Sequence, residues 1–379
     1  MIRNATDIVN AELEGRVRHY SFRKNPTQPT ASGFWFDLSM SPGTPPPKYW
    51  FDSSPLSSVQ VKQSTDGGLF HGADVVPDKK YLRLISLMTV TSTALPMSLR
   101  LLDYLLYYPT VDDSITDPQV MTNNFQTLST FTTPTPPAYQ DNTLTLTTNN
   151  LMPYTRCRVS TTGVLPGGLA ADTDYWSIRV SDTTCRLASS RANAVANNHV
   201  IITDSGSGTH SLKTILPRYT DGVGVQMLPI SLGARTGGFT FYVTYTNSSG
   251  VAGRVSKTVM QNPGATVGVI ATSNPNAGAG ATFAYSDNFI PLQEGDTGVQ
   301  SIESVTMLTG DVGLMSLILV KPLAETELKE ITAPHEKDFF ISGGKLPEIK
   351  DDAFLSLICV PVGSLAATGL IGSIKVIWG

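Results

Sequence analysis

The chain has 379 residues, of which only 15% are charged, and its formal net charge is −4. Soluble proteins carry about 25% charged residues and duplex-binding proteins present a basic face, so this composition excludes direct nucleic-acid binding. It also excludes a mostly helical protein, because exposed helix faces need many charged side chains. Abundant Thr, with 32 Gly and 25 Pro, instead predicts an all-β protein with two β-sandwich or jelly-roll-like domains, a small inserted β module and extended arms.

Residues 1–30 are predicted to form an N-terminal arm with a short helix. Thr6 is placed to cap this helix, and Gly15 is a natural end. A short amphipathic arm of this kind often docks on a neighbouring subunit, because it is only marginally stable alone. The arm contains acidic residues and no long apolar core, so we expect no secretory signal and synthesis in the cytoplasm.

Strand patterns fill residues 31–135 and 215–265, which we expect to form one discontinuous β-sandwich domain. The strongest strand signals are YLRLISLMTVT, which begins at Tyr81, and MSLRLLDYLLYY, which begins at Met97. The second segment is also long enough for a helix, and both interpretations remain open at this point. Residues 112–140 are polar and rich in proline, which predicts a linker or an extended arm over a surface.

Residues 266–379 are expected to form a second, C-terminal β-sandwich domain. This domain includes a predicted short helix in the sequence LAETELKEI, residues 323–331. The uncharged run Ala353–Ile374 is long enough to span a bilayer, but Pro361 and several glycines interrupt it. We therefore predict two buried strands joined by a turn, and no membrane partner.

Residues 141–214 differ in residue pattern from the segments on either side and are predicted to be an inserted small β module. An insertion is tolerated where its two ends lie close together at the surface of the host domain. The module holds Cys157 and Cys185, which could form a disulfide if adjacent strands bring them together. The alternative is that both are small buried thiols, which agrees with the low cysteine content of the chain.

No residue pattern for catalysis stands out, so we expect a protein that is not an enzyme and binds no cofactor. The histidines lie apart in the sequence and form no pair of ligands: His19, His71, His199, His210 and His335. Two acidic loops could hold calcium through oxygen ligands, one with Asp112, Asp113 and Asp117 and one with Asp221. Neither has the alternating aspartate spacing of a calcium loop, which favours solvated turn residues and no metal site.

The inserted module resembles a small β module that recurs in structural proteins of tailed bacteriophages. The similar segments are STTGVLPGGL, TDYWSI, LASSRANA and GSGTHSL, which lie between residues 160 and 212. The resemblance covers about 70 residues around these segments, under a fifth of the chain. It implies a location in the virion, synthesis in the cytoplasm of the bacterial host, and assembly with other virion proteins.

Together with the low charge and the predicted arms, this resemblance favours a homo-oligomeric capsid decoration or cement protein that stabilises the head, with a trimer as the expected oligomer. Its partners would be copies of itself and the major capsid protein or other virion proteins.

The alternative is a tail, baseplate or fibre protein whose module contacts a host surface. A glycan or partner would then stack on exposed aromatic residues of the module, for which the candidates are Tyr154, Tyr175 and Trp176. Neighbouring residues of a strand face opposite ways, which favours a core position for some of these residues.

Overall fold

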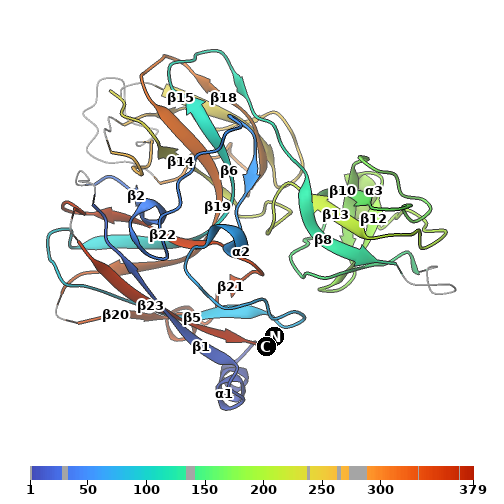
Figure 1. The fold of residues 1–379 in the computed structure, drawn as a ribbon, viewed down its shortest axis with the longest axis horizontal. Helices are drawn as coiled ribbons and strands as arrows, with labels where there is room; N and C mark the ends of the chain where they lie inside the picture. Colours follow the sequence, from blue (N-terminus) through green and yellow to red (C-terminus); the bar gives the residue numbers. More distant parts are fainter. Residues whose placement is uncertain are drawn as a thin grey trace.

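The computed structural model describes residues 2–27, 33–133, 141–236, 240–262, 266–272, 288–331, 333–366 and 368–379. Strands dominate these residues and assemble into three sheets and one closed barrel, which confirms the predicted all-β class. Figure 1 shows the three sheets on one side of the molecule and the barrel projecting from the other.

The first sheet, called the terminal sheet here, contains strands from both ends of the chain. It consists of β1 (Val17–Lys24), β3 (Gly43–Thr44), β5 (Lys80–Thr89), β20 (His335–Asp338), β21 (Glu348–Ile349) and β23 (Leu370–Trp378). The strand order is β20-β5-β23-β1-β3, and β21 also pairs with β5. The last strand of the chain is therefore an interior strand of this sheet.

The second sheet, called the central sheet, contains the two longest strands. Its members are β2 (Phe36–Asp37), β4 (Val59–Gln60), β6 (Met97–Asp112), β14 (Gln226–Ser231), β19 (Leu314–Leu328) and β22 (Leu355–Pro361). Their order is β14-β19-β6-β22-β2, with β4 also paired to β6. β6 and β19 are antiparallel and stay paired along their whole lengths, through three register shifts.

The third sheet, called the distal sheet, consists of β7 (Gln119–Val120), β15 (Thr240–Asn247), β16 (Arg254–Val255), β17 (Val259–Met260) and β18 (Val299–Met307). Short helices join the elements: α1 (Ala5–Leu13), α2 (Gln63–Asp66), α4 (Phe339–Gly343) and the 3-10 helix η1 (Leu38–Met40).

The barrel closes in the order β10-β11-β12-β9-β8-β13. Its strands are β8 (Gln126–Thr132), β9 (Leu144–Leu146), β10 (Arg156–Thr161), β11 (Tyr175–Arg179), β12 (Thr184–Ala188) and β13 (His210–Thr214), and α3 (Arg191–Val195) lies beside it. Buried side chains from all six strands fill its interior as a separate core. Closure leaves no unpaired edge, as is typical of small β-barrels.

The central sheet takes part in two sandwiches. Leu101 of β6 packs into a core with the terminal sheet, and Leu105 packs into a core with the distal sheet. Leu102 and Tyr104, on the opposite face of β6, pack into a third core with Trp50 from an extended segment. Because both faces of β6 are buried, its sequence from Leu101 to Tyr108 is apolar or aromatic except for Asp103, without alternation. This double burial explains why the segment is a strand although its length also allows a helix.

Strand pairing cuts across the division of the chain expected from sequence. β19 and β22, from the expected C-terminal domain at 266–379, both pair with β6 from the expected domain at 31–135. β23 likewise pairs with β1 and β5. Each sandwich is thus assembled from both halves of the chain, because pairing between distant strands leaves no local signal in sequence.

The N-terminal helix is present, but its cap differs from the prediction. Asp7 N donates to Asn4 Oδ1 at 3.0 Å, and Asn4 N donates to Asp7 Oδ2 at 3.2 Å, so Asn4 is the cap and Thr6 lies inside α1. This reciprocal pair satisfies backbone donors that a helix start leaves free. Much of the rest of the expected arm at 1–30 is β1, a paired strand of the terminal sheet.

The predicted helix at residues 323–331 is wrong, because β19 continues through Leu328 and stays paired with β6 as far as Met97. Thr326 and Leu328 are buried and their neighbours Glu325 and Glu327 are less so, which is the alternation of a strand. Glu, Lys and Leu favour helices in isolation, but tertiary pairing overrides that preference here.

The expected arm at residues 112–140 is in part wrong as well. It contains β7, which joins the distal sheet, and β8, which is a strand of the barrel. The barrel thus begins at Gln126, before the predicted module at 141–214, and residues 134–140 of the expected arm lie outside the described residues. A Thr-rich strand between prolines resembles a linker in composition, so the sequence alone predicts a linker at the position of β8.

The uncharged run Ala353–Ile374 contains β22 and the first part of β23, so it holds two strands as predicted. Among the described residues, no helix is both long and apolar enough to cross a membrane.

Candidate functional site

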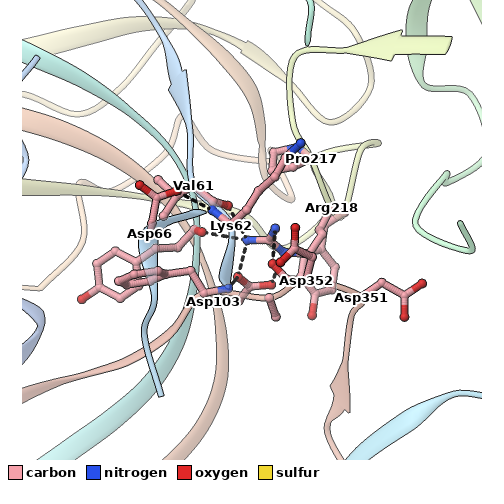
Figure 2. A network of polar contacts seen from close by, with 12 residues as sticks. Val61, Lys62, Asp66, Asp103, Pro217, Arg218, Asp351 and Asp352 are labelled. Carbon is pink, nitrogen blue, oxygen red and sulfur yellow. Dashed lines mark hydrogen bonds and ion pairs between the residues drawn. The ribbon is translucent and has the colours of Figure 1, made fainter. Parts of the chain in front are cut away.

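The chain leaves the barrel at Thr214 and returns directly onto the central sheet. Gln60 Nε2 donates to the carbonyl oxygens of Thr214, at 3.1 Å, and Ile215, at 2.7 Å. Arg218 then reaches Asp103 of β6: its Nε lies 2.8 Å from Oδ2 and its Nη2 lies 2.7 Å from Oδ1. Both side chains are almost fully buried. Figure 2 shows this two-pronged ion pair at the centre of a polar network.

Arg218 also donates to three backbone oxygens, two from other segments and one from β6 itself. Nη1 donates to Asp352 O at 3.0 Å, and Nη2 donates to Val61 O at 3.0 Å and Tyr104 O at 2.8 Å. Burial raises the pKa of the Asp103 carboxyl, and the positive charge of Arg218 opposes that shift. Buried charges are tolerated when they form a bidentate ion pair and their remaining hydrogen-bonding atoms also have partners.

Asp103 lies at the seam between the two sandwiches. Leu101 belongs to the core under the terminal sheet and Leu105 to the core under the distal sheet, so the ion pair fills the position between them. The same arginine is four residues beyond the last barrel strand. One side chain therefore joins the barrel connection, both sandwiches and the segment around Asp352.

Further contacts fix the barrel on the body. Thr155 Oγ1 and Thr220 Oγ1 are 2.6 Å apart, and Met152 N donates to Thr220 Oγ1 at 2.9 Å. Lys79, which directly precedes β5, forms an ion pair with Asp182 on the barrel side, with 3.3 Å between Lys79 Nζ and Asp182 Oδ1. The barrel is thus held by side chains on several segments, and not only by its two chain connections.

A cavity of about 210 Å³ lies in this junction, between Thr148 of the barrel side and Asp74, Asp351 and Asp352 of the body. Burial, with the nearby charge of Asp74, raises the pKa of Asp351 to about 6, against the opposing charges of Lys80 and Lys350. Figure 2 shows the Asp351 side chain pointing away from the Arg218–Asp103 pair.

Asp351→Asn should stabilise the protein above pH 6. A carboxyl whose pKa is raised on folding favours the folded state at low pH, and that contribution is lost as the pH rises through about 6. Removing the charge should therefore raise the free energy of unfolding by about 1–2 kcal/mol at pH 8 and change it little at pH 4. Urea unfolding at both pH values measures this difference. An equal effect at the two pH values would contradict the assignment.

The three aromatic residues predicted from sequence do not share one surface. Tyr175 is in the barrel core, where its hydroxyl accepts from Ala170 N at 2.9 Å. Trp176, its strand neighbour, is half-buried, and Tyr154 is 38% exposed with the Arg191 guanidinium 5.7 Å from its ring centre. A ring from a glycan or partner could therefore stack on Tyr154 and, over a smaller area, on Trp176.

Three other residues considered from sequence, His71, Asp113 and Asp221, have structural partners. His71 is buried, its Nε2 lies 2.8 Å from Ala353 O, and Lys80 Nζ donates to its Nδ1 at 3.0 Å. Burial, with Lys80 beside it, lowers the pKa of His71 to about 3. Asp113 faces the buried Arg235 at 3.4 Å, and Asp221 accepts from Val223 N at 3.2 Å.

Within the part of the chain that is described, no group of three or more His, Cys, Asp or Glu residues is arranged to hold a metal ion. Cys157 and Cys185 are both buried in the barrel core as free thiols, which matches the second of the two alternatives drawn from sequence.

A groove runs along the C-terminal half of β19. Three adjoining cavities of about 720, 490 and 420 Å³ form it, and neighbouring cavities share lining residues such as Glu325 and Glu327. The largest cavity lies beside Tyr219 and has apolar walls from Leu323, Phe339 and other residues. A search of the sequence for catalytic motifs does not find such a surface, because its lining residues form no catalytic motif.

Comparison with known proteins identifies no family. No protein-family model and no curated protein matches the chain. Solved structures of VP2 from infectious bursal disease virus align weakly. A mutant VP2 in derived T=1 particles has 10% identity and a TM-score of 0.15 over 95% of this chain and 77% of that one. VP2 of the Gx strain has 13% identity and a TM-score of 0.14 over 96% and 81%. TM-scores this low carry no argument about fold or function.

Proposed function

We propose that this protein is a non-enzymatic virion structural protein of a tailed bacteriophage, and specifically a homo-oligomeric decoration protein on the capsid surface. The observation that carries the proposal is the closed barrel fixed on a two-sandwich body through Arg218 and Asp103. A rigidly mounted barrel that projects from a broad β body suits a subunit that lies on a particle and presents a module outward (Figure 1).

Two further features support the proposal. The barrel includes the segments that resemble the recurrent phage module, from Ser160 to Leu212. The low charge of the chain reduces the cost of removing water from large subunit interfaces, and Thr hydroxyls can satisfy polar groups there. Assembly at high copy number needs such surfaces and needs no polar cleft for chemistry.

Light scattering combined with co-sedimentation tests this function. The purified chain should form a defined homo-oligomer, with a trimer expected, and should sediment with empty heads that lack it. Heads that already carry their full complement serve as the matched control and should bind no more. A strict monomer that ignores heads would contradict the proposal, and binding to purified tails alone would favour the tail or baseplate alternative.

A further inference from the structure

Among the residues that the structure describes, no strand pairs with the outer edge of β19 along the groove. β14 covers this edge only as far as Val320, which pairs with Gln226. From Lys321 to Leu328, β19 pairs with β6 on one side, and no strand among the described residues pairs with its other side. Lys337 Nζ donates to Glu325 O at 2.7 Å, so a lysine protects one carbonyl of this edge. Charged side chains at exposed edge strands commonly prevent those strands from pairing with other chains.

The largest cavity of the groove combines apolar walls with excess positive charge. Lys321, Lys337 and Lys345 line it, and none of them forms an ion pair among the described residues. The two carboxylates on the same cavity already have partners: Glu325 pairs with Arg100, and Glu348 pairs with Lys350. This largest cavity, called the basic groove from here on, suits an apolar side chain accompanied by a carboxylate.

A surface of the opposite character lies at the other end of the central sheet. The loops 112–118 and 308–313 meet there, with Asp113 N donating to Gly313 O at 3.1 Å. Their exposed apolar side chains are Ile115, Leu308 and Val312, at 43%, 52% and 60% exposure. Asp117 is exposed beside them and forms no ion pair in the described part of the chain. We call these two loops the acidic tip.

The acidic tip cannot reach the basic groove of its own chain. The tip lies where Asp112 pairs with Leu314, whereas the groove follows β19 from Lys321 toward the end where Leu328 pairs with Met97. Lys321, where the groove begins, is seven residues from Leu314, and a rise of about 3.3 Å per residue places the two positions roughly 23 Å apart. The complementary surfaces are therefore available only to different copies.

We propose that the acidic tip of one copy docks in the basic groove of the next copy, head to tail. Ile115 and its apolar neighbours would cover the apolar walls, and Asp117 would face Lys337 and Lys345. A heterologous contact of this kind closes into a ring when its rotation permits. The inference deepens the proposed homo-oligomer by naming its interface, and it does not depend on which particle the protein joins.

A mixing experiment with two variants tests this contact. The groove variant carries Lys337→Glu and Lys345→Glu, and the tip variant carries Ile115→Ser and Asp117→Lys. These side chains are exposed or half-buried, so both variants should fold, which circular dichroism and thermal melting check. Lys257→Glu, at an exposed lysine that belongs neither to the groove nor to the tip, is the control and should assemble like the natural chain.

Each variant alone should fall to the mass of a single 40.6 kDa chain in light scattering. An equimolar mixture should form a dimer of twice that mass and no larger species, because only one intact tip and one intact groove remain. A monomeric natural chain, variants that still assemble fully, or a mixture that stays monomeric would each overturn the inference. If the mixture dimerises but the natural chain does not bind heads, only the virion role fails.

Discussion

Arg218→Met should lower the free energy of unfolding by about 3–5 kcal/mol, the usual cost of removing one partner from a buried ion pair. Asp103 would be left fully buried without its counter-charge, and three backbone oxygens would lose their donor. Burial already raises the pKa of Asp103, and loss of Arg218 should raise it further. Urea unfolding at neutral pH measures the loss of stability.

The double variant Arg218→Met with Asp103→Asn is the control for this result. It removes the uncompensated charge, so it should recover part of the stability lost in Arg218→Met. Lys213→Met, a lysine on the last barrel strand that is not fully buried, should change stability by less than about 0.5 kcal/mol. A small effect of Arg218→Met would mean that the pair does not hold the barrel connection on the central sheet.

Trp50→Ala should cost about 3–5 kcal/mol, as large aromatic truncations in a core do. Trp50 is fully buried in the third core and stacks on Tyr104 at 5.2 Å between ring centres. Its Nε1 donates to Asp37 Oδ2 at 2.7 Å, and the Tyr104 hydroxyl donates to Asp37 Oδ1 at 2.8 Å. Truncation therefore leaves a cavity and takes one donor from a buried carboxyl.

Two variants separate these contributions. Trp50→Phe keeps much of the volume and loses the donor to Asp37, so it should cost less than Trp50→Ala. Tyr49→Ala removes the neighbouring aromatic residue, which is 54% exposed, and should change stability little. Equal melting temperatures for Tyr49→Ala and Trp50→Ala would contradict the placement of this extended segment over the central sheet.

Elements with one buried face could be predicted from sequence. β15 alternates between buried and half-buried residues up to Asn247, and that alternation is visible in its residues. β6 is buried on both faces, so its apolar run is compatible with a helix until its partners are known. β8 and the end of β19 were missed because their composition resembles a linker and a helix, and pairing with distant strands decides their structure.

Of the two residues in the buried ion pair, only Asp103 could be anticipated from the sequence. Asp103 is a lone carboxylate inside the apolar run of β6, which is a signal that a buried partner exists. That partner, Arg218, lies 115 residues further on, in a segment without any motif. The groove and the acidic tip are formed by surfaces that meet only in the folded chain, so residue order alone does not reveal their complementary charge.

Imaging of labelled particles tests the proposed structural role on a phage particle most directly. A phage strain whose copy of this protein carries a small electron-dense label would be purified and imaged by electron microscopy. We expect label at many symmetric positions on the head surface. Purified particles without label, from lysates that contain the labelled protein, would contradict the proposed role.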